Sequence, residues 1–227
     1  MAAAIPVIAV DGPSGAGKGT LSHLLAERLH WHFLDSGALY RVTGQACLIE
    51  GVSWQDHAAV AEVARHLQVS FVTDAGGEVR VSYRGCDVSR EIRTEEGGRG
   101  ASTVAAIPAV REALLARQRD FRQPPGLVAD GRDMGTVVFP DAPLKIFLTA
   151  SAAERARRRY QQLLAKGENV SLPRLLEDIE ERDARDSSRS VAPLVPAEDA
   201  IVLDSSTMPI TEVFDTVMRA VRQRGLA

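Results

Sequence analysis

Residues 12–20 read GPSGAGKGT, a stretch in which four glycines surround one lysine. Gly12, Gly17 and Lys18 match the pattern G-x-x-x-x-G-K. In loops of this pattern, backbone N–H groups converge on an anion, and the N-terminus of the following helix adds a positive partial charge. The lysine brings a full charge to the β- and γ-phosphates of a nucleotide. The other reading is a glycine-rich turn with an incidental lysine.

The flanking sequence favours the phosphate-binding loop. Residues 5–10 are an apolar run that predicts a buried strand, and leucines recur at helical spacing after the loop. The residue after Lys18 is Gly19, with Thr20 one place later, where the usual pattern has Ser or Thr next to the lysine. Whether a hydroxyl coordinates Mg²⁺ beside the lysine therefore stays open. The predicted ATP-binding residues of the loop are Gly12, Pro13, Ser14, Gly15, Ala16, Gly17, Lys18, Gly19 and Thr20.

Further elements that must position this loop follow along the chain. Apolar runs at residues 127–130, 144–150 and 200–205 have the length of strands. Helical patterns separate them, and one of these begins at Ser151-Ala-Ala-Glu154, which resembles a capping box. Apolar strands that alternate with helices predict a parallel sheet covered on both sides.

One stretch interrupts the alternation. Residues 69–85 show two runs of alternating apolar residues with DAGGE between them, which predicts a β-hairpin. We expect the hairpin to belong to a small insertion, together with a helical pattern from Val60 to Leu67.

Composition limits the classes of protein. The chain has 227 residues, 45% of them hydrophobic and 25% charged, and a formal net charge of −3. A protein that binds nucleic acid generally is usually basic, so we expect no nucleic-acid partner. No apolar run reaches membrane-spanning length, and residues 1–10 lack the basic lead of a signal peptide, so we expect a cytoplasmic protein without a membrane partner.

Longer motifs narrow the function. The GKGT ending resembles the nucleoside-monophosphate kinases. Together with it, FLDSGALYR, SREIRTEE, VREALLARQRDF, ADGRDMGTVVFPDAPLKIFLTAS and ERDARDSSRSVAPLVPA resemble the bacterial cytidylate kinases over nearly the whole chain. DGRDMGTVVFPDA is the most specific of these segments.

The resemblance implies a fold and a reaction. The fold would be α/β: a doubly wound, parallel-sheet P-loop kinase core, a small antiparallel monophosphate-binding insertion and a short helical lid. We place the core at residues 1–36, 106–154 and 190–227, the insertion at 37–105 and the lid at 155–189. The enzyme would transfer the γ-phosphoryl group of ATP to CMP or dCMP with Mg²⁺, and we expect a monomer.

The resemblance also implies roles for single residues. Arg132, Arg182 and Arg189 would neutralise the transferring phosphates together with Lys18, because arginine pairs well with phosphate oxygens. Apart from the resemblance, Asp130 ends an apolar strand, a place from which a carboxylate would hold Mg²⁺, directly or through water; the other interpretation is a helix or turn cap. Without the resemblance, the run ERDARDSSR would read as a solvated helix with pairs such as Glu181–Arg185.

The remaining assignments concern the two nucleotides. Arg157 would stack on adenine. Asp133 would accept a hydrogen bond from the cytosine amine, and Arg111 would donate to the base, although Arg111 also reads as an ordinary surface charge. The resemblance assigns the CMP or dCMP site to Ser36, Tyr40, Arg41, Ser102, Arg111, Arg132, Asp133 and Asp186.

Two other functions stay open at this point. A phosphate-binding loop does not choose the acceptor, so the chain could be a kinase for another nucleoside monophosphate or a small alcohol. It could also be a nucleotide-binding switch that acts on a partner. Such a switch would need an interaction surface, and it would not need a cluster of arginines.

Overall fold

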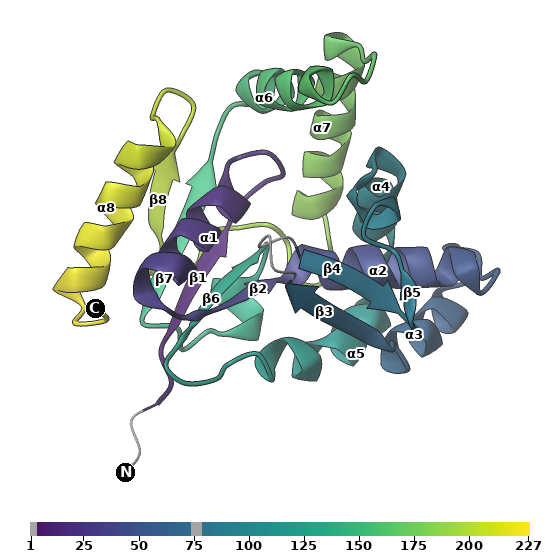
Figure 1. The fold of residues 1–227 in the computed structure, drawn as a ribbon, viewed down its shortest axis with the longest axis horizontal. Helices are drawn as coiled ribbons and strands as arrows, with labels where there is room; N and C mark the ends of the chain where they lie inside the picture. Colours follow the sequence, from purple (N-terminus) through teal and green to yellow (C-terminus); the bar gives the residue numbers. More distant parts are fainter. Residues whose placement is uncertain (1–3, 74–78) are drawn as a thin grey trace. The chain divides into compact units, whose positions relative to one another are not determined.

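The computed structural model describes residues 4–73 and 79–227. The chain divides into two compact units, one made of Met1–Asp35 with Arg119–Ala227 and the other of Ser36–Gln118 (Figure 1). The predicted core, insertion and lid are defined by their roles in the reaction, and this division stays a prediction. Within the described residues, no helix has the length and apolar character needed to cross a bilayer.

The first unit is built on a five-stranded parallel sheet in the order β2-β6-β1-β7-β8. From β1 in the middle, the chain winds first toward one edge and then toward the other, so the predicted doubly wound sheet is confirmed. Every residue of β1 and β6 is buried, as expected for strands covered on both faces. The strands are β1 (Val7–Asp11), β2 (His32–Asp35), β6 (Leu127–Gly131), β7 (Leu144–Thr149) and β8 (Ile201–Asp204).

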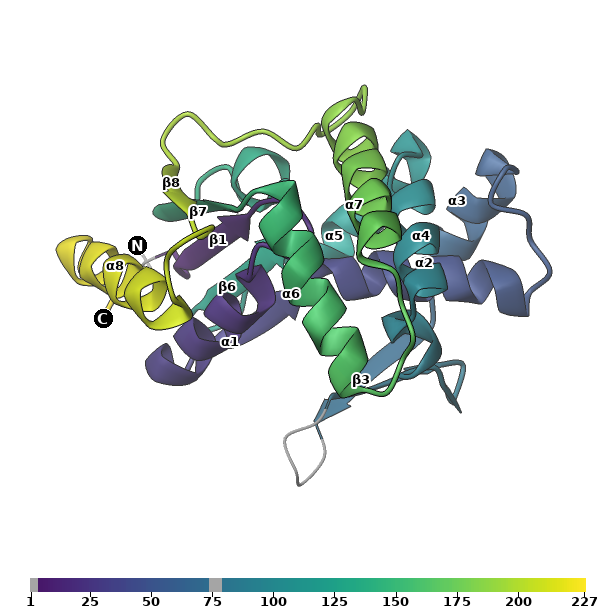
Figure 2. The ribbon, with the colours of Figure 1, turned by 90° about the horizontal axis from the view of Figure 1, so that it is seen from above.

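Helices α1 and α8 cover one face of this sheet (Figure 2). Leu21 and Leu25 of α1 and Val213 and Val217 of α8 share one buried cluster with Ile8 of β1 and other strand residues. Leu21 and Leu25, which belong to the leucine spacing that predicted α1, therefore lie on its buried face. The helices of this unit are α1 (Lys18–Leu29), α6 (Ala152–Ala165), α7 (Leu172–Ser187), α8 (Ile210–Gln223) and the π-helical turn η2 (Met134–Val138).

The start of α6 differs in part from the predicted capping box. Ser151 Oγ accepts a hydrogen bond from the N–H of Glu154 at 3.2 Å, which is the forward half of the box. The reverse half is not formed, because the N–H of Ser151 donates to Ser206 Oγ at 2.9 Å. The Glu154 carboxylate instead accepts from the guanidinium groups of Arg157 and Arg158, which outcompete a backbone N–H because they are charged.

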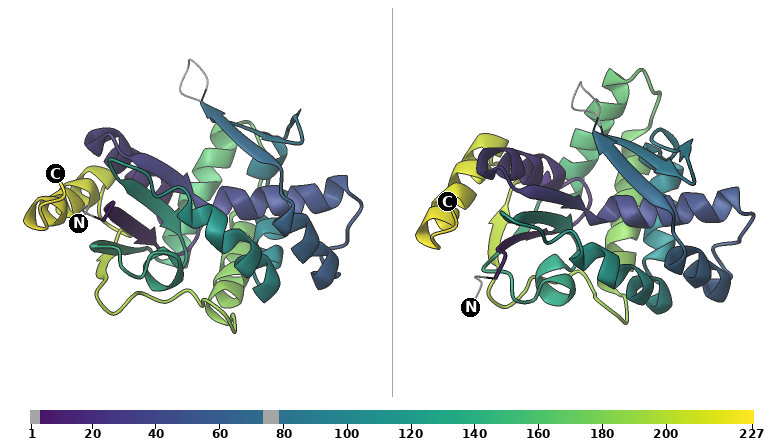
Figure 3. Two further views of the ribbon diagram at one scale, coloured as in Figure 1. Left: turned by 90° about the horizontal axis from the view of Figure 1, so that it is seen from below. Right: turned by 60° about the horizontal axis from the view of Figure 1, so that its bottom comes forward.

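The second unit contains a three-stranded sheet in the order β3-β4-β5 and a set of helices (Figure 3). β3 and β4 pair antiparallel, so the predicted hairpin strands are confirmed, while the predicted turn at residues 74–78 lies outside the described residues. The elements are α2 (Ser36–Ile49), α3 (His57–Arg65), β3 (Val69–Thr73), β4 (Val79–Tyr83), β5 (Cys86–Asp87), η1 (Glu91–Arg93), α4 (Glu95–Val104) and α5 (Pro108–Arg119).

Helices α2 and α4 approach each other at a pair of glycines. A methyl group on Gly44 would lie 3.2 Å from the carbonyl carbon of Gly100, and one on Gly100 would lie 2.7 Å from Cζ2 of Trp54. The Trp54 ring cannot easily move away, because its Nε1 donates to the carbonyl of Gly44 at 3.0 Å. The small residues therefore set how closely these helices pack.

We predict that Gly100→Ala destabilises the protein. Overpacking of a tight core costs about 1–3 kcal/mol, and this outweighs the roughly 1 kcal/mol that alanine gains over glycine in a helix. The free energy of unfolding, measured with urea, should fall by about 1 kcal/mol. Arg99→Ala on the same helix, at an exposed position, is the control and should change it by less than about 0.5 kcal/mol. A Gly100→Ala protein as stable as the parent would contradict the close packing.

Candidate functional site

The glycine loop lies where the sequence predicted it, between the end of β1 at Asp11 and the start of α1 at Lys18. Gly12 has a φ of 145°, and a Cβ there would lie 1.9 Å from the carbonyl oxygen of Leu148. Gly17 precedes the helix with a φ of 98°. Both positions require glycine, because side chains of L-residues strain this backbone and the first also has no room.

Side-chain donors hold three carbonyl groups of the loop. In a trans peptide the C=O and the next N–H point in opposite directions. Holding the carbonyls to the protein therefore turns the following N–H groups of the loop the other way, toward a bound anion. The bonds run from Lys18 Nζ to the carbonyl oxygen of Pro13 (2.9 Å), from Arg155 Nη1 to that of Ser14 (3.0 Å) and from Ser205 Oγ to that of Ala16 (3.0 Å).

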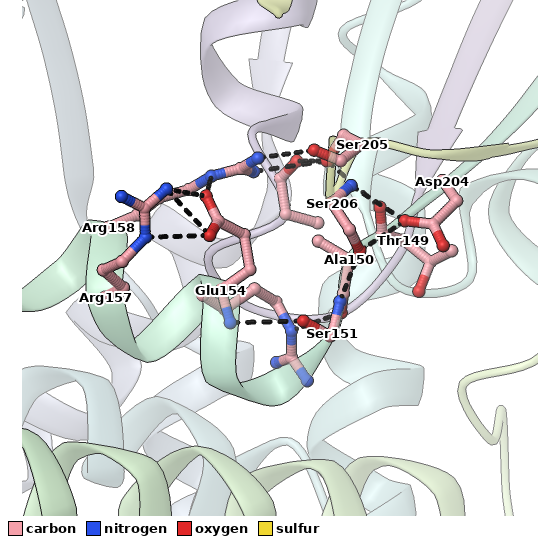
Figure 4. A network of polar contacts seen from close by, with 11 residues as sticks. Thr149, Ala150, Ser151, Glu154, Arg157, Arg158, Asp204, Ser205 and Ser206 are labelled. Carbon is pink, nitrogen blue, oxygen red and sulfur yellow. Dashed lines mark hydrogen bonds and ion pairs between the residues drawn. The ribbon is translucent and has the colours of Figure 1, made fainter. Parts of the chain in front are cut away.

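Ser205 belongs to a polar network between the end of β8 and the start of α6 (Figure 4). Arg158 donates from Nη1 to Ser205 Oγ at 3.2 Å and from Nη2 to the carbonyl of the same residue. Glu154 bridges Arg158 and Arg157. The Arg157 side chain is 60% exposed, so its predicted stacking on adenine stays a prediction that this geometry allows.

Lys18 is a buried cation near a carboxylate. Its side chain is 6% exposed, and Nζ lies 3.9 Å from Oδ1 of Asp130. Burial lowers the pKa of Lys18, the nearby Arg132 lowers it further, and these effects outweigh the attraction of Asp130. The ammonium group is thus short of negative charge, which a bound polyphosphate would supply.

Three predicted arginines surround Asp186, which is 1% exposed. Its Oδ2 lies 3.2 Å from Nε of Arg132 and 4.0 Å from Nε of Arg182, and its Oδ1 accepts from Nη2 of Arg189. Burial alone raises the pKa of Asp186, but the three guanidinium groups outweigh it and hold the pKa below its usual range.

The structure also divides the charged run of α7. Arg185 is exposed and lies 3.5 Å from Glu181, as a solvated helix would have it. Arg182 instead points to the buried Asp186. One segment therefore has a solvated face and a face that contributes to the arginine cluster.

Asp11 positions the loop that carries two of the predicted residues. Its carboxylate accepts hydrogen bonds from the backbone N–H groups of Met134 and Gly135, both at 2.8 Å. These bonds hold the start of η2, directly after Arg132 and Asp133. Asp133 is itself buried. Asp11 is not among the residues predicted from the sequence, although its place directly before Gly12 is a usable signal.

Asp130 fits a hydrated Mg²⁺. Mg²⁺ usually takes one or two carboxylates and completes its shell with water and substrate phosphates. Asp130 lies at the carboxyl end of β6, where an open parallel sheet places ligands, and next to the lysine of the loop. A single carboxylate at this place is sufficient for such a site.

The remaining predicted residues lie in the second unit. Arg111 is 7% exposed, so it is not an ordinary surface charge. Its guanidinium lies 5.5 Å from the ring centroid of Tyr40, and its Nη1 donates to the carbonyl of Ala105 at 3.2 Å. Arg41 donates to the carbonyl of Ile92 at 3.4 Å. Ser36 and Ser102 are buried.

Ser205 is also absent from the predicted site residues, and Arg155 has no predicted role within a run of arginines. Ser205 follows β8 directly, so the rule that ligands bind at the carboxyl ends of strands could have found it. Nothing in the sequence separates Arg155 from Arg157, Arg158 and Arg159.

We predict that Asp186→Asn is strongly destabilising at pH 7. The substitution leaves three guanidinium groups without their shared charge, and breaking a buried pair costs about 3–5 kcal/mol. The pKa of Asp186 is lowered by folding, so its contribution is present above the carboxyl pKa of the unfolded chain, about 4, and is lost as the pH falls below that value. Urea unfolding should therefore show a large difference at pH 7 that shrinks in acid.

Glu181→Gln is the control, because it removes an exposed ion pair from the same helix. Its cost should stay below about 1 kcal/mol. An equal fall in the free energy of unfolding for the two variants would contradict the prediction that the buried Asp186 contributes more than an exposed carboxylate.

Comparison with known proteins agrees with the resemblance. The sequence model of the cytidylate kinase family matches residues 8–223. The chain is 60% identical over 227 residues to a cytidylate kinase of Pseudomonas paraeruginosa, with 99% of each chain covered. It is 60% identical over 219 residues to one of Aeromonas hydrophila (96% of this chain, 95% of that one). The match to one of Yersinia enterocolitica is 59% over 227 residues, covering 100% and 98%. The loop, the doubly wound sheet and this similarity lead to one conclusion: the chain belongs to the cytidylate kinase family.

Proposed function

We propose that the protein transfers the γ-phosphoryl group of ATP to CMP or dCMP and yields ADP and CDP or dCDP. The observation that supports the proposal is that Arg132 and Arg182 lie close enough to Lys18 of the glycine loop to lower its pKa, in a chain of this family. Arg189 joins these two arginines at Asp186. An oxygen of the acceptor phosphate attacks the γ-phosphorus, and the bond from that phosphorus to the β,γ-bridging oxygen breaks. Such a reaction depends on positioning and on neutralising the phosphate oxygens.

The proposed catalytic residues divide this work. Lys18 binds oxygens of the β- and γ-phosphates, and the backbone N–H groups of the loop bind the rest of the triphosphate. Arg132 binds the acceptor phosphate and connects it to the P-loop core. Arg182 and Arg189 neutralise the charge that spreads over the transferring group, as fixed cationic groups do in phosphoryl transfer. Closure of residues 155–189 as a lid over these phosphates stays part of the proposal.

Asp130 is the proposed carboxylate for Mg²⁺, directly or through a water molecule. When bound, Mg²⁺ would neutralise charge on the β- and γ-phosphates. Thr20 is exposed at the start of α1, and Gly19 stands where the usual pattern has a hydroxyl. We therefore assign the protein's contribution to Asp130 rather than to a hydroxyl beside Lys18.

The acceptor site is proposed from the family resemblance and from the chemistry of cytosine. Ser36 and Arg41 would bind the phosphate of CMP, with Tyr40 near the same pocket, and Asp186 would contact its ribose. Cytosine has a donor amine at N4 and an acceptor at N3, whereas uracil has an acceptor at O4 and a donor at N3. Asp133, with Ser102, would accept from the amine, and Arg111 would donate to the base.

A panel of nucleoside monophosphates tests the proposal. The protein, ATP and Mg²⁺ are incubated with CMP, dCMP, UMP, AMP or GMP, and the diphosphate product is measured. We expect product from CMP or dCMP. Product only from another acceptor would replace the proposed substrate. ATP consumption that does not depend on any acceptor would favour the switch. Small-molecule substrates are sufficient for this function, and the expected monomer, cytoplasmic location and lack of nucleic-acid or membrane partners stay predictions.

We predict that Lys18→Ala leaves the fold intact and removes most activity. The loss of one charge that acts in the transition state is worth about 10²–10³-fold in kcat. Steady-state assays of CDP formation measure the effect, and circular dichroism checks the fold. Lys166→Ala, at an exposed position after α6, should keep full activity. A folded Lys18→Ala protein with nearly normal turnover would overturn the assignment of the loop.

We predict that Asp133→Ala abolishes most of the preference for CMP over UMP, chiefly by lowering kcat/KM for CMP. Buried polar groups left without partners can reject the wrong base by roughly 10⁴-fold, so the parent protein should discriminate strongly. The measurement is kcat/KM for both nucleotides in both proteins, with Asp215→Ala as an exposed control. An unchanged ratio would mean that Asp133 does not read the base.

A further inference from the structure

Arg155 is a buried arginine that contacts three separate parts of the first unit. Its side chain is 4% exposed. Nε donates to the carbonyl of Ala150 at 2.9 Å, and Nη1 donates to the carbonyl of Ser14 at 3.0 Å. Nη1 also donates to Oδ1 of Asp183 at 3.1 Å, and Nη2 donates to Oδ2 of the same carboxylate. The guanidinium thus connects the end of β7, the phosphate loop and helix α7.

The hydrogen bond from Arg155 to the loop holds a carbonyl group that affects phosphate binding. The carbonyl of Ser14 is one of the three that side chains hold, and its orientation sets the direction of the N–H of Gly15. Gly15 has a φ of 79°, and a Cβ there would lie 3.2 Å from Cβ of Arg155. The arginine therefore packs directly against the segment whose N–H groups would bind phosphate.

The ion pair between Arg155 and Asp183 lies on the part of α7 that carries residues of the arginine cluster. Asp183 lies between Arg182 and Asp186, the residues through which α7 takes part in the arginine cluster. A bidentate pair fixes both the distance and the orientation of the two groups, which a lysine at position 155 could not do. The position of α7 is therefore tied to the position of the phosphate loop.

We infer that Arg155 and Asp183 are positioning residues that couple nucleotide binding at the phosphate loop to the placement of the α7 arginines. This rests on the proposed function only in that the loop binds ATP. When the loop closes on a triphosphate, the carbonyl of Ser14 and the guanidinium of Arg155 move together. Because Asp183 is paired with that guanidinium, helix α7 shifts in the same direction. A purely structural ion pair would contribute to stability without this coupling.

Hydrogen exchange tests the coupling without turnover. The non-hydrolysable analogue AMP-PNP with Mg²⁺, and no CMP, is added to the full-length protein, and exchange is measured over residues 172–187. We expect the analogue to slow exchange there in the parent protein. In Asp183→Asn, which keeps the shape of the side chain and removes its charge, the analogue should still bind and the slowing should be lost. Asp178→Asn removes an exposed carboxylate from the same helix and should behave like the parent.

Kinetics give a second readout. Asp183→Asn should lower kcat by about 10- to 100-fold, because a displacement of about 1 Å at a reacting centre has this effect. KM for ATP should be nearly unchanged, since the bond from Arg155 to Ser14 remains. In Arg155→Lys, kcat should fall similarly and AMP-PNP should bind more weakly. Adding Asp183→Asn to Arg155→Lys should then cost little more, because the two residues act through one pair.

The outcomes separate this inference from the proposed function. Slowed exchange in Asp183→Asn equal to that of the parent, or additive kinetic losses in the double variant, would overturn the coupling and leave the kinase proposal intact. Normal coupling in a protein that does not phosphorylate CMP would overturn only the proposed substrate. A parent protein that does not bind AMP-PNP would overturn both.

Discussion

The accumulation of buried positive charge beside β1 and β6 is the constraint on which the rest of the site depends. A site for phosphates needs cations held in a place with little water, yet cations without partners destabilise a fold. The protein meets both demands with two carboxylates. Asp186 is shared by Arg132, Arg182 and Arg189, and Asp130 lies near Lys18. Burial and Arg132 lower the pKa of Lys18 more than Asp130 raises it, and an anionic ligand would add to the attraction of Asp130.

Charge alone does not bind a triphosphate, because the peptide groups of the loop must also point the right way. That orientation depends on atoms distant in sequence. Gly12 passes under the carbonyl of Leu148, Arg155 holds the carbonyl of Ser14, and Ser205 holds that of Ala16. The loop is therefore shaped by its neighbours in the sheet and in α6, and its glycines permit that shape without imposing it.

Much of the architecture could be predicted because it follows from local patterns. Continuous apolar runs identified β1, β6, β7 and β8 as strands, and the hairpin strands β3 and β4 followed from alternation. The expected cover on both faces is wrong for β8, an edge strand in which Val202 is 56% exposed. Strand β2 (His32–Asp35) was missed, because only Leu34 of its four residues is buried and the chain carries no apolar run there. The capping box at α6 was predicted in full and is half formed, since the N–H of Ser151 donates to Ser206, a residue distant in sequence that a local pattern does not reveal.

For the site, the sequence was enough to identify the chemical groups and their approximate places. The spacing of Gly12, Gly17 and Lys18 predicts a phosphate-binding loop, since glycines permit the backbone conformation that such a loop needs, and the longer motifs identify the family. Which charges meet depends on the tertiary structure. Arg182 and Arg185 are three residues apart on one helix, yet one faces the buried Asp186 and the other an exposed glutamate. Arg155 differs in the same way from the arginines that follow it, because burial and pairing across the fold, rather than residue type, determine what a charged side chain does.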